Sequence, residues 1–262
     1  MSEAIPVVIS RAGPVGIVEL ARPEKFNCLS IAVHGLLEAA LDAFEEPGSG
    51  VRAVLVRAQG KNFCTGADLD EVLSLRVDAD KVSRFIGPAH RVLKRLESSD
   101  LPVVAACQGL ALAGGLELML ACDVVFAAKD ARFGDQHAQF GLLPGFGGSQ
   151  RLPRIVGLRR AMDLFLSARW IEADTALQWG LVNYVVEADR LADAAQDYCA
   201  ALATRSRIGL STMKRFARQG LEGSLEAGLA MEERLVSAAL LHDDVSEGLA
   251  AFQARRKPRF GS

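Results

Sequence analysis

The pattern of apolar and polar positions divides the chain into two parts. Up to about Arg151, short apolar runs alternate with segments in which apolar residues recur at helical spacing. This alternation is typical of βα units with buried strands. Strands, the first two of them a hairpin, are predicted at Ile5–Ile9, Val15–Leu20, Val51–Val56, Val103–Cys107 and Asp123–Ala128. Helices are predicted from the N-cap Ser30 to Pro47 and over Val82–Leu96.

After Arg151 the strand pattern nearly disappears and helical spacing dominates. Helices are predicted at Glu172–Trp179, Ala188–Ala203, Ile208–Arg218, Leu225–Ala239 and Val245–Arg255. We therefore expect a helical C-terminal region that packs on the α/β core or on a neighbouring subunit.

Composition excludes several classes of protein. The 262 residues include 30 basic and 32 acidic side chains, and this balance favours neither nucleic acid nor an anionic membrane as partner. The most apolar region, Leu101–Ala128, is interrupted by Glu117 and Asp123, which argues against a membrane span. The N-terminus lacks a secretory pattern, and the five cysteines show no metal-ligand spacing. We expect a cytoplasmic protein with reduced thiols and no metal.

Three glycine-bearing stretches could carry chemistry: Asn62–Asp68, Ala113–Glu117 and Gly141–Gln150. None matches GxGxxG or GxxxxGK[ST], so the nucleotide-binding fingerprints are absent. In the second stretch, glycines open an apolar helix, whose first amides are unpaired and lie at its positive end. Such amides suit a carbonyl oxygen that becomes negative during a reaction. Close helix packing is the alternative explanation for these glycines.

Glu117 stands among Leu, Met, Ala and Gly, where an ionised carboxylate is costly unless it is held or used. One interpretation is structural: with Gly114 as N-cap, Glu117 is the third helical residue and can bond back to the cap amide. The other interpretation is that Glu117 is catalytic.

Five segments, in this order, resemble the crotonase (enoyl-CoA hydratase/isomerase) superfamily over nearly the whole chain. They are LARPEKFNCLS, VRAVLVRAQGKNFCTGADLDEV, LPVVAACQGLALAGGLELMLACDVVFA, ARFGDQHAQFGLLPGFGGSQRLPRIVG and AFQARRKPRF. The resemblance implies an α/β fold, a crotonase/ClpP-like spiral of ββα units over residues 1–195. A helical region over residues 196–262 would serve oligomerisation and pocket closure. It also implies an acyl-CoA substrate, with coenzyme A as part of the substrate and no separate cofactor, and a homotrimer or dimer of trimers.

The resemblance assigns roles to individual residues. The amides of Ala67 and Gly114 would form an oxyanion hole for the thioester oxygen. Lys25 and Phe26 would run beside coenzyme A. Glu117 matches the first of the two glutamates with which hydratases of this family activate water. The segment that lines the coenzyme A and acyl entrance matches Ala67, Asp68, Leu69 and Asp70.

The chain departs from the hydratase pattern at His137, where the second glutamate is expected; Asp135 is the nearest carboxylate. An imidazole can exchange a proton near neutral pH but cannot supply a second negative charge. His137 is therefore either a catalytic replacement or a packing residue. His90 matches the histidine base of the 4-chlorobenzoyl-CoA dehalogenase branch, but Gly145 stands where that branch has its nucleophilic aspartate, which argues against dehalogenation.

His90 and Phe146 remain candidates for the acyl pocket. We predict an enoyl-CoA hydratase-like lyase in which Glu117 and His137 handle the water and the proton at C2. The alternatives are a CoA-ester isomerase, a β-dicarbonyl C–C hydrolase, or a catalytically quiet acyl-CoA-binding member of the superfamily.

Overall fold

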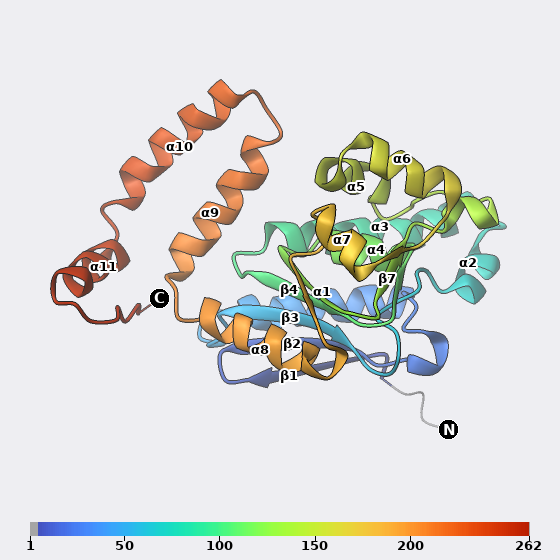
Figure 1. The fold of residues 1–262 in the computed structure, drawn as a ribbon, viewed down its shortest axis with the longest axis horizontal. Coiled ribbons are helices and arrows are strands. Elements are labelled where there is room, and N and C mark those ends of the chain that lie inside the picture. Colours follow the sequence, from blue (N-terminus) through green and yellow to red (C-terminus); the bar gives the residue numbers. More distant parts are fainter. Residues whose placement is uncertain (1–4, 262) are drawn as a thin grey trace.

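The computed structural model describes residues 5–261 and is built on a six-stranded sheet (Figure 1). The hairpin of β1 (Val7–Ala12) and β2 (Val15–Leu20) is antiparallel, and all further pairings in this sheet are parallel. Its strand order is β1-β2-β3-β4-β6-β9. The remaining strands are β3 (Ala53–Ala58), β4 (Val103–Cys107), β6 (Val124–Ala128) and β9 (Tyr184–Val186).

A second sheet holds the short strands that follow the main ones. It consists of β5 (Leu110–Leu112), β7 (Arg132–Gly134) and β8 (Ile171–Glu172), in the order β5-β7-β8. Thus β4 is followed by β5 and the helix α4 (Gly114–Leu120), and β6 is followed by β7 and then by helices. Each such unit contributes one strand to each sheet, which agrees with the expected ββα repeat.

The predicted helices of the first part are present. The Ser30 Oγ accepts a hydrogen bond from the Val33 amide at 3.2 Å and caps α1 (Ile31–Glu45), as the sequence indicated. The second predicted helix is α3 (Ala79–Ser98), which packs against α1. Short helices that the sequence did not reveal precede these two: the 3-10 helix η1 (Pro23–Lys25) lies before α1, and α2 (Leu69–Leu75) lies before α3.

The sequence placed strand ends less well than strand centres. β3 ends two residues later than predicted, because it pairs with β2 over six residues as far as Leu20–Ala58. β5, β7, β8 and β9 were missed, since two or three residues are too short to show a strand period. After Arg151 the described residues hold two strands, β8 with two residues and β9 with three, in agreement with the prediction that strands nearly disappear there.

Helices make up most of the second part. The sequence predicted the exact bounds of α10 (Leu225–Ala239). α8 (Leu191–Leu202) packs on the six-stranded sheet, where its Tyr198 ring lies 5.4 Å from the Phe126 ring of β6. The others are η2 (His137–Phe140), α5 (Gly148–Val156), α6 (Leu158–Ser167), α7 (Ala173–Gln178), η3 (Ala188–Arg190), α9 (Arg207–Gly220) and α11 (Asp243–Gln253).

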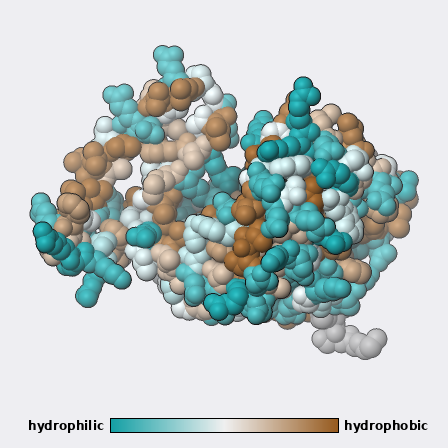
Figure 2. All heavy atoms as spheres, viewed as in Figure 1, coloured by the Kyte–Doolittle hydropathy of each residue, from teal (hydrophilic) through white to brown (hydrophobic). Residues whose placement is uncertain are grey.

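Helices α9, α10 and α11 extend away from the core (Figure 1). No residue of α9 or α10 is fully buried, and apolar side chains gather along this extension (Figure 2). The exposed ones on α10 include Leu225, Leu229 and Val236. Within residues 5–261, no helix combines the length and the apolar character needed to cross a membrane.

Candidate active site

An open cavity of about 120 Å³ lies between α2, α3, α4 and the segment that leads into α5. Its walls are largely apolar: they are formed by Leu69, Val72, Leu75, Val82, Phe85, Ile86, Leu142, Leu143 and Phe146. Two ionisable side chains, Glu117 and His137, reach it, together with the backbone of Ala67, Gly114 and Gly145. The cavity thus offers an apolar chamber with a small polar centre.

Two tight turns bring Ala67 and Gly114 to this cavity. Gly66 has φ +116°, and a Cβ built on it would lie 3.2 Å from the Gly114 nitrogen. Ala113, the N-cap of α4, also has a positive φ of 49°. Within residues 5–261 the amides of Ala67 and Gly114 donate to no protein acceptor, so both are available to a ligand. The geometry fits the predicted pair of oxyanion donors.

Glu117 does not cap its own helix. The N-cap of α4 is Ala113, and the Glu117 amide donates to the Ala113 carbonyl at 3.0 Å, which makes Glu117 the fourth helical residue. The interpretation that Gly114 is the N-cap and Glu117 the third residue is therefore wrong. The Glu117 Oε1 instead accepts from the amides of Phe146 at 2.8 Å and Gly148 at 2.7 Å.

These two donors hold a carboxylate that is only 1% exposed. Burial raises the pKa of the Glu117 carboxyl above its ordinary value, while the Gly148 amide, His137 and the Phe146 amide oppose that shift. Gly148 opens α5, so Oε1 also lies at the positive end of that helix. A Cβ on Gly148 would lie 2.9 Å from the Glu117 Cγ, which explains a glycine at this position.

His137 lies opposite Glu117. It is the first residue of η2, and its Nε2 lies 3.9 Å from the Glu117 Oε2. Its Nδ1 lies 3.0 Å from the Oδ1 of Asp135, although this approach is not aligned as a hydrogen bond. The same Oδ1 accepts from the His137 amide at 3.3 Å. The imidazole is therefore flanked by two buried carboxylates, and the sequence alone had left open whether Asp135 faces it.

The predicted entrance residues occupy different positions. Leu69 lines the cavity, whereas Asp68 caps α2 and forms an ion pair with Arg22 at 3.0 Å. Lys25 pairs with Asp70 at 2.6 Å, on the surface. Phe26 is 52% exposed and has a φ of 51°.

The two pocket candidates are placed differently, and a third residue was missed. Phe146 lines the cavity, but His90 lies half-buried on α3 and is not among the lining residues. His34 of α1 is buried behind the wall, edge-on to the Phe146 and Phe85 rings at 5.2 and 5.9 Å. Burial lowers the pKa of His34 to about 4, so it is neutral at neutral pH. Its position on the apolar face of a predicted helix was the only signal.

No group of His, Cys, Asp and Glu side chains suited to a metal ion occurs among residues 5–261. All five cysteines are buried and free of disulfides.

Comparison with known proteins decides the family. The family model described as "Enoyl-CoA hydratase/isomerase" matches residues 11–262. The chain belongs to this family. It is 36% identical over 254 residues to the "Probable enoyl-CoA hydratase" of Rhizobium meliloti, with 97% of each chain covered. It is 31% identical to the "Short-chain-enoyl-CoA hydratase" of Clostridium acetobutylicum, over 96% of this chain and 95% of the other.

Solved structures give the same result for the fold. An enoyl-CoA hydratase from Polaromonas sp. JS666 superposes with a TM-score of 0.93 at 30% identity, covering 97% of this chain and 99% of that chain. One from Bacillus anthracis gives a TM-score of 0.92 at 33% identity, with 97% and 98% covered. The α/β crotonase fold, with two sheets and C-terminal helices, is thereby confirmed.

Proposed function

We propose that this protein is an enoyl-CoA hydratase, which adds water across the C2=C3 bond of a 2-enoyl-CoA or removes it from the 3-hydroxy compound. The observation that carries this proposal is the position of Glu117. Its carboxylate is held by two backbone amides and faces His137 inside the cavity that also holds the amides of Ala67 and Gly114. Hydratases among the relatives support the same activity.

In this proposal the thioester oxygen accepts hydrogen bonds from the amides of Ala67 and Gly114. Negative charge builds on that oxygen as an enolate forms, and preorganised donors stabilise it without reorganisation. Losing one such donor typically costs about 10²–10³-fold in rate. Because both donors belong to the backbone, they are held by the turns at Gly66 and Ala113.

Glu117 and His137 would then handle the water. The Glu117 Oε1 is bound by two amides, which leaves Oε2 facing the His137 Nε2 across 3.9 Å, a distance suited to a bridging water. The water oxygen bonds to C3 as one of its protons passes to this pair. The enolate then collapses as C2 takes a proton from Glu117 and His137. These two side chains thereby return to the protonation they had before the reaction. The apolar walls suit an apolar acyl group.

A second function is favoured by one observation. Glu117 is the only carboxylate among the residues that line the cavity within residues 5–261, since Asp135 lies beside His137 rather than on the wall. One base is enough for a CoA-ester isomerase or a β-dicarbonyl C–C hydrolase, so these reactions remain the alternatives.

A panel of acyl-CoA esters incubated in heavy-oxygen water and analysed by mass spectrometry separates the possibilities. Label in a 3-hydroxyacyl product supports hydration. Label in a free acid indicates hydrolysis, and a shifted double bond without label indicates isomerisation. Binding without turnover across the panel would identify a quiet acyl-CoA-binding protein and refute the proposal.

A further inference from the structure

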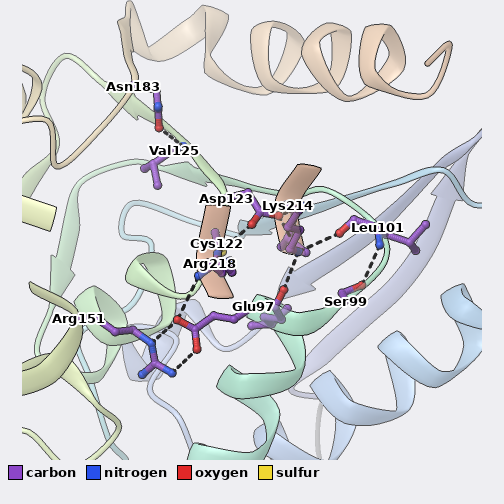
Figure 3. Close-up of polar contacts among 12 residues, drawn as sticks. Glu97, Ser99, Leu101, Cys122, Asp123, Val125, Arg151, Asn183, Lys214 and Arg218 are labelled. Carbon is purple, nitrogen blue, oxygen red and sulfur yellow. Dashed lines mark hydrogen bonds and ion pairs between the residues drawn. The ribbon is translucent and has the colours of Figure 1, made fainter. Parts of the chain in front are cut away.

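Arg151, in the first turn of α5, joins the loop that holds Glu117 to α3. Its Nε and Nη2 donate to the two carboxylate oxygens of Glu97 at 2.7 and 2.6 Å, a bidentate ion pair (Figure 3). Its Nη1 donates to the Phe146 carbonyl at 2.8 Å. The Arg151 side chain is only 13% exposed, so this geometry is fixed by packing as well as by charge.

Phe146 is therefore held from both of its backbone groups. Its carbonyl accepts from Arg151, and its amide donates to the Glu117 Oε1. The next residue, Gly147, has φ +104°, and a Cβ there would lie 2.1 Å from the Arg151 Nη1. The guanidinium thus lies directly against the loop whose amides bind Glu117.

Helix α9 reaches the same ion pair from the other side. Arg218 donates to Glu97 at 3.3 Å and to Asp123 at 2.8 Å, and Lys214 pairs with Asp123 at 2.7 Å (Figure 3). Direct contacts therefore run without a break from α9 through Glu97 and Arg151 to the loop that binds Glu117.

We propose that Arg151 is a positioning residue, which with Glu97 holds the Phe146 and Gly148 amides against Glu117, and that Arg218 braces this pair from α9. The role of Glu117 in proton transfer is taken from the function proposed above.

The physical reason is that both donors to the Glu117 Oε1 are backbone amides, of Phe146 and Gly148, so their positions depend on the loop. If the loop relaxes, Oε1 loses its two amides, the carboxylate turns in the cavity, and the ionised form loses stabilisation. The other titratable groups that act on the Glu117 charge, His137 and Asp135, receive none of the hydrogen bonds that Arg151 donates. A misplacement of about 1 Å can cost about 10²-fold in rate, even from a change away from the reacting atoms.

The first test compares Arg151→Gln and Arg151→Lys with Arg154→Gln. Arg154 lies on the same helix and bonds Gln150, so its replacement serves as the matched control. We expect kcat on an enoyl-CoA to fall about 10²-fold in Arg151→Gln, with KM changed little. Arg151→Lys, which keeps the charge beside Glu97, should retain an intermediate rate and also serves if the Gln variant folds poorly. Arg154→Gln should match the wild type.

The second readout needs no turnover. The titration of the Glu117 carboxyl can be followed by carbon-13 NMR with labelled glutamate, assigned by difference against Glu117→Gln. Arg151→Gln should move the pKa of Glu117 upward, whereas Arg154→Gln should leave it unchanged. An unmoved titration, with activity per folded molecule intact, overturns the positioning role. If the titration moves but no acyl-CoA is turned over even by the wild type, the proposed function fails and the positioning role stands.

The brace from α9 has its own test. Arg218→Gln should lower kcat less than Arg151→Gln does, while the exposed Arg215→Gln on the same helix should have no effect. Because Arg218 is proposed to act through Glu97 and Arg151, the variant that combines Arg151→Gln with Arg218→Gln should be no slower than Arg151→Gln alone. If the two effects multiply instead, Arg218 does not act through this pair and the brace is refuted.

Discussion

At the scale of single residues, the candidate site centres on a buried carboxylate, Glu117, which accepts hydrogen bonds from the backbone and faces the His137 imidazole. The Oε1 of Glu117 is bonded by the Phe146 and Gly148 amides, while its Oε2 is turned toward His137. The side chain is thereby oriented with one oxygen bound and the other directed at its neighbour. Such an arrangement suits proton exchange better than it suits stability, because burial alone destabilises the ionised form.

We expect Glu117→Gln to lower kcat by about 10²–10⁴-fold, because the amide keeps the shape of the side chain but cannot exchange the proton. The affinity for acyl-CoA should change little, since the oxyanion donors are untouched. Steady-state kinetics and titration calorimetry measure the two quantities. A variant that unfolds while each folded molecule keeps full activity would show that Glu117 is only structural.

The raised pKa of Glu117 also predicts how stability depends on pH. The folded carboxyl holds its proton more firmly than the unfolded one, whose pKa is about 4.3. The stability that the protein gains by holding this proton is therefore fully present below the unfolded-state pKa of about 4.3. It is lost as the pH rises through the folded-state pKa of Glu117. Relative to Glu117→Gln, the wild type should lose unfolding free energy over this window. Denaturant unfolding of both proteins at several pH values measures the difference, and parallel curves would contradict the prediction.

His137 gives the sharpest prediction about the reaction. If it replaces the second glutamate, His137→Ala should remove most of the hydration, by about 10²-fold or more. His137→Glu should restore part of it by recreating a carboxylate pair. The rates of the three proteins on one enoyl-CoA provide the measurement. An unchanged rate in His137→Ala would make His137 a packing residue and favour single-carboxylate chemistry.

At the scale of elements, short turns rather than long helices shape the site. The turn at Gly66, with φ +116°, lies against Gly114, where a Cβ would be 3.2 Å from the Gly114 nitrogen, and Gly148 lies against Glu117, where a Cβ would be 2.9 Å from the Glu117 Cγ. The helices behind these turns, α4 and α5, present the amides of their first residues: that of Gly114 has no protein acceptor within residues 5–261, and that of Gly148 donates to the Glu117 Oε1. Three chain segments that are far apart in sequence thus supply backbone donors to one cavity.

We expect Gly148→Ala to lower both stability and activity, because its Cβ would lie 2.9 Å from the Glu117 Cγ. Overpacking of this kind typically costs about 1–3 kcal/mol. Gly35→Ala is the matched control, since it lies on α1 with no atom within 4 Å of its Cβ, and should stabilise by about 0.4–1 kcal/mol. Thermal unfolding and kcat of both variants test this, and a Gly148→Ala protein as stable and active as the control would contradict it.

At the scale of the whole molecule, the C-terminal helices expose large apolar side chains. Leu225, Leu229 and Val236 are exposed on α10, while α9 is tied to the core by Lys214 and Arg218. An exposed apolar face of this kind is typical of an interface between protein chains.

We therefore predict a homotrimer or a dimer of trimers in solution, as the resemblance implied. Light scattering coupled to gel filtration measures the mass of the assembly. Leu229→Glu should reduce that mass by placing a charge on the apolar face of α10, whereas replacing an exposed polar neighbour, Glu232→Gln, should not. A monomeric wild type at micromolar concentration would refute the prediction.

The sequence by itself determined the main strands, the capped helix α1, the bounds of α10 and the family, because each depends on local periodicity or on motifs in a fixed order. It also marked Glu117, since a lone carboxylate in an apolar run is unusual. Only the tertiary structure decided what holds that carboxylate, because the amides of Phe146 and Gly148 lie about 30 residues further along the chain and leave no side-chain signal. The contacts of Glu97 with Arg151 and Arg218 likewise depend on how distant segments pack, which no local pattern encodes.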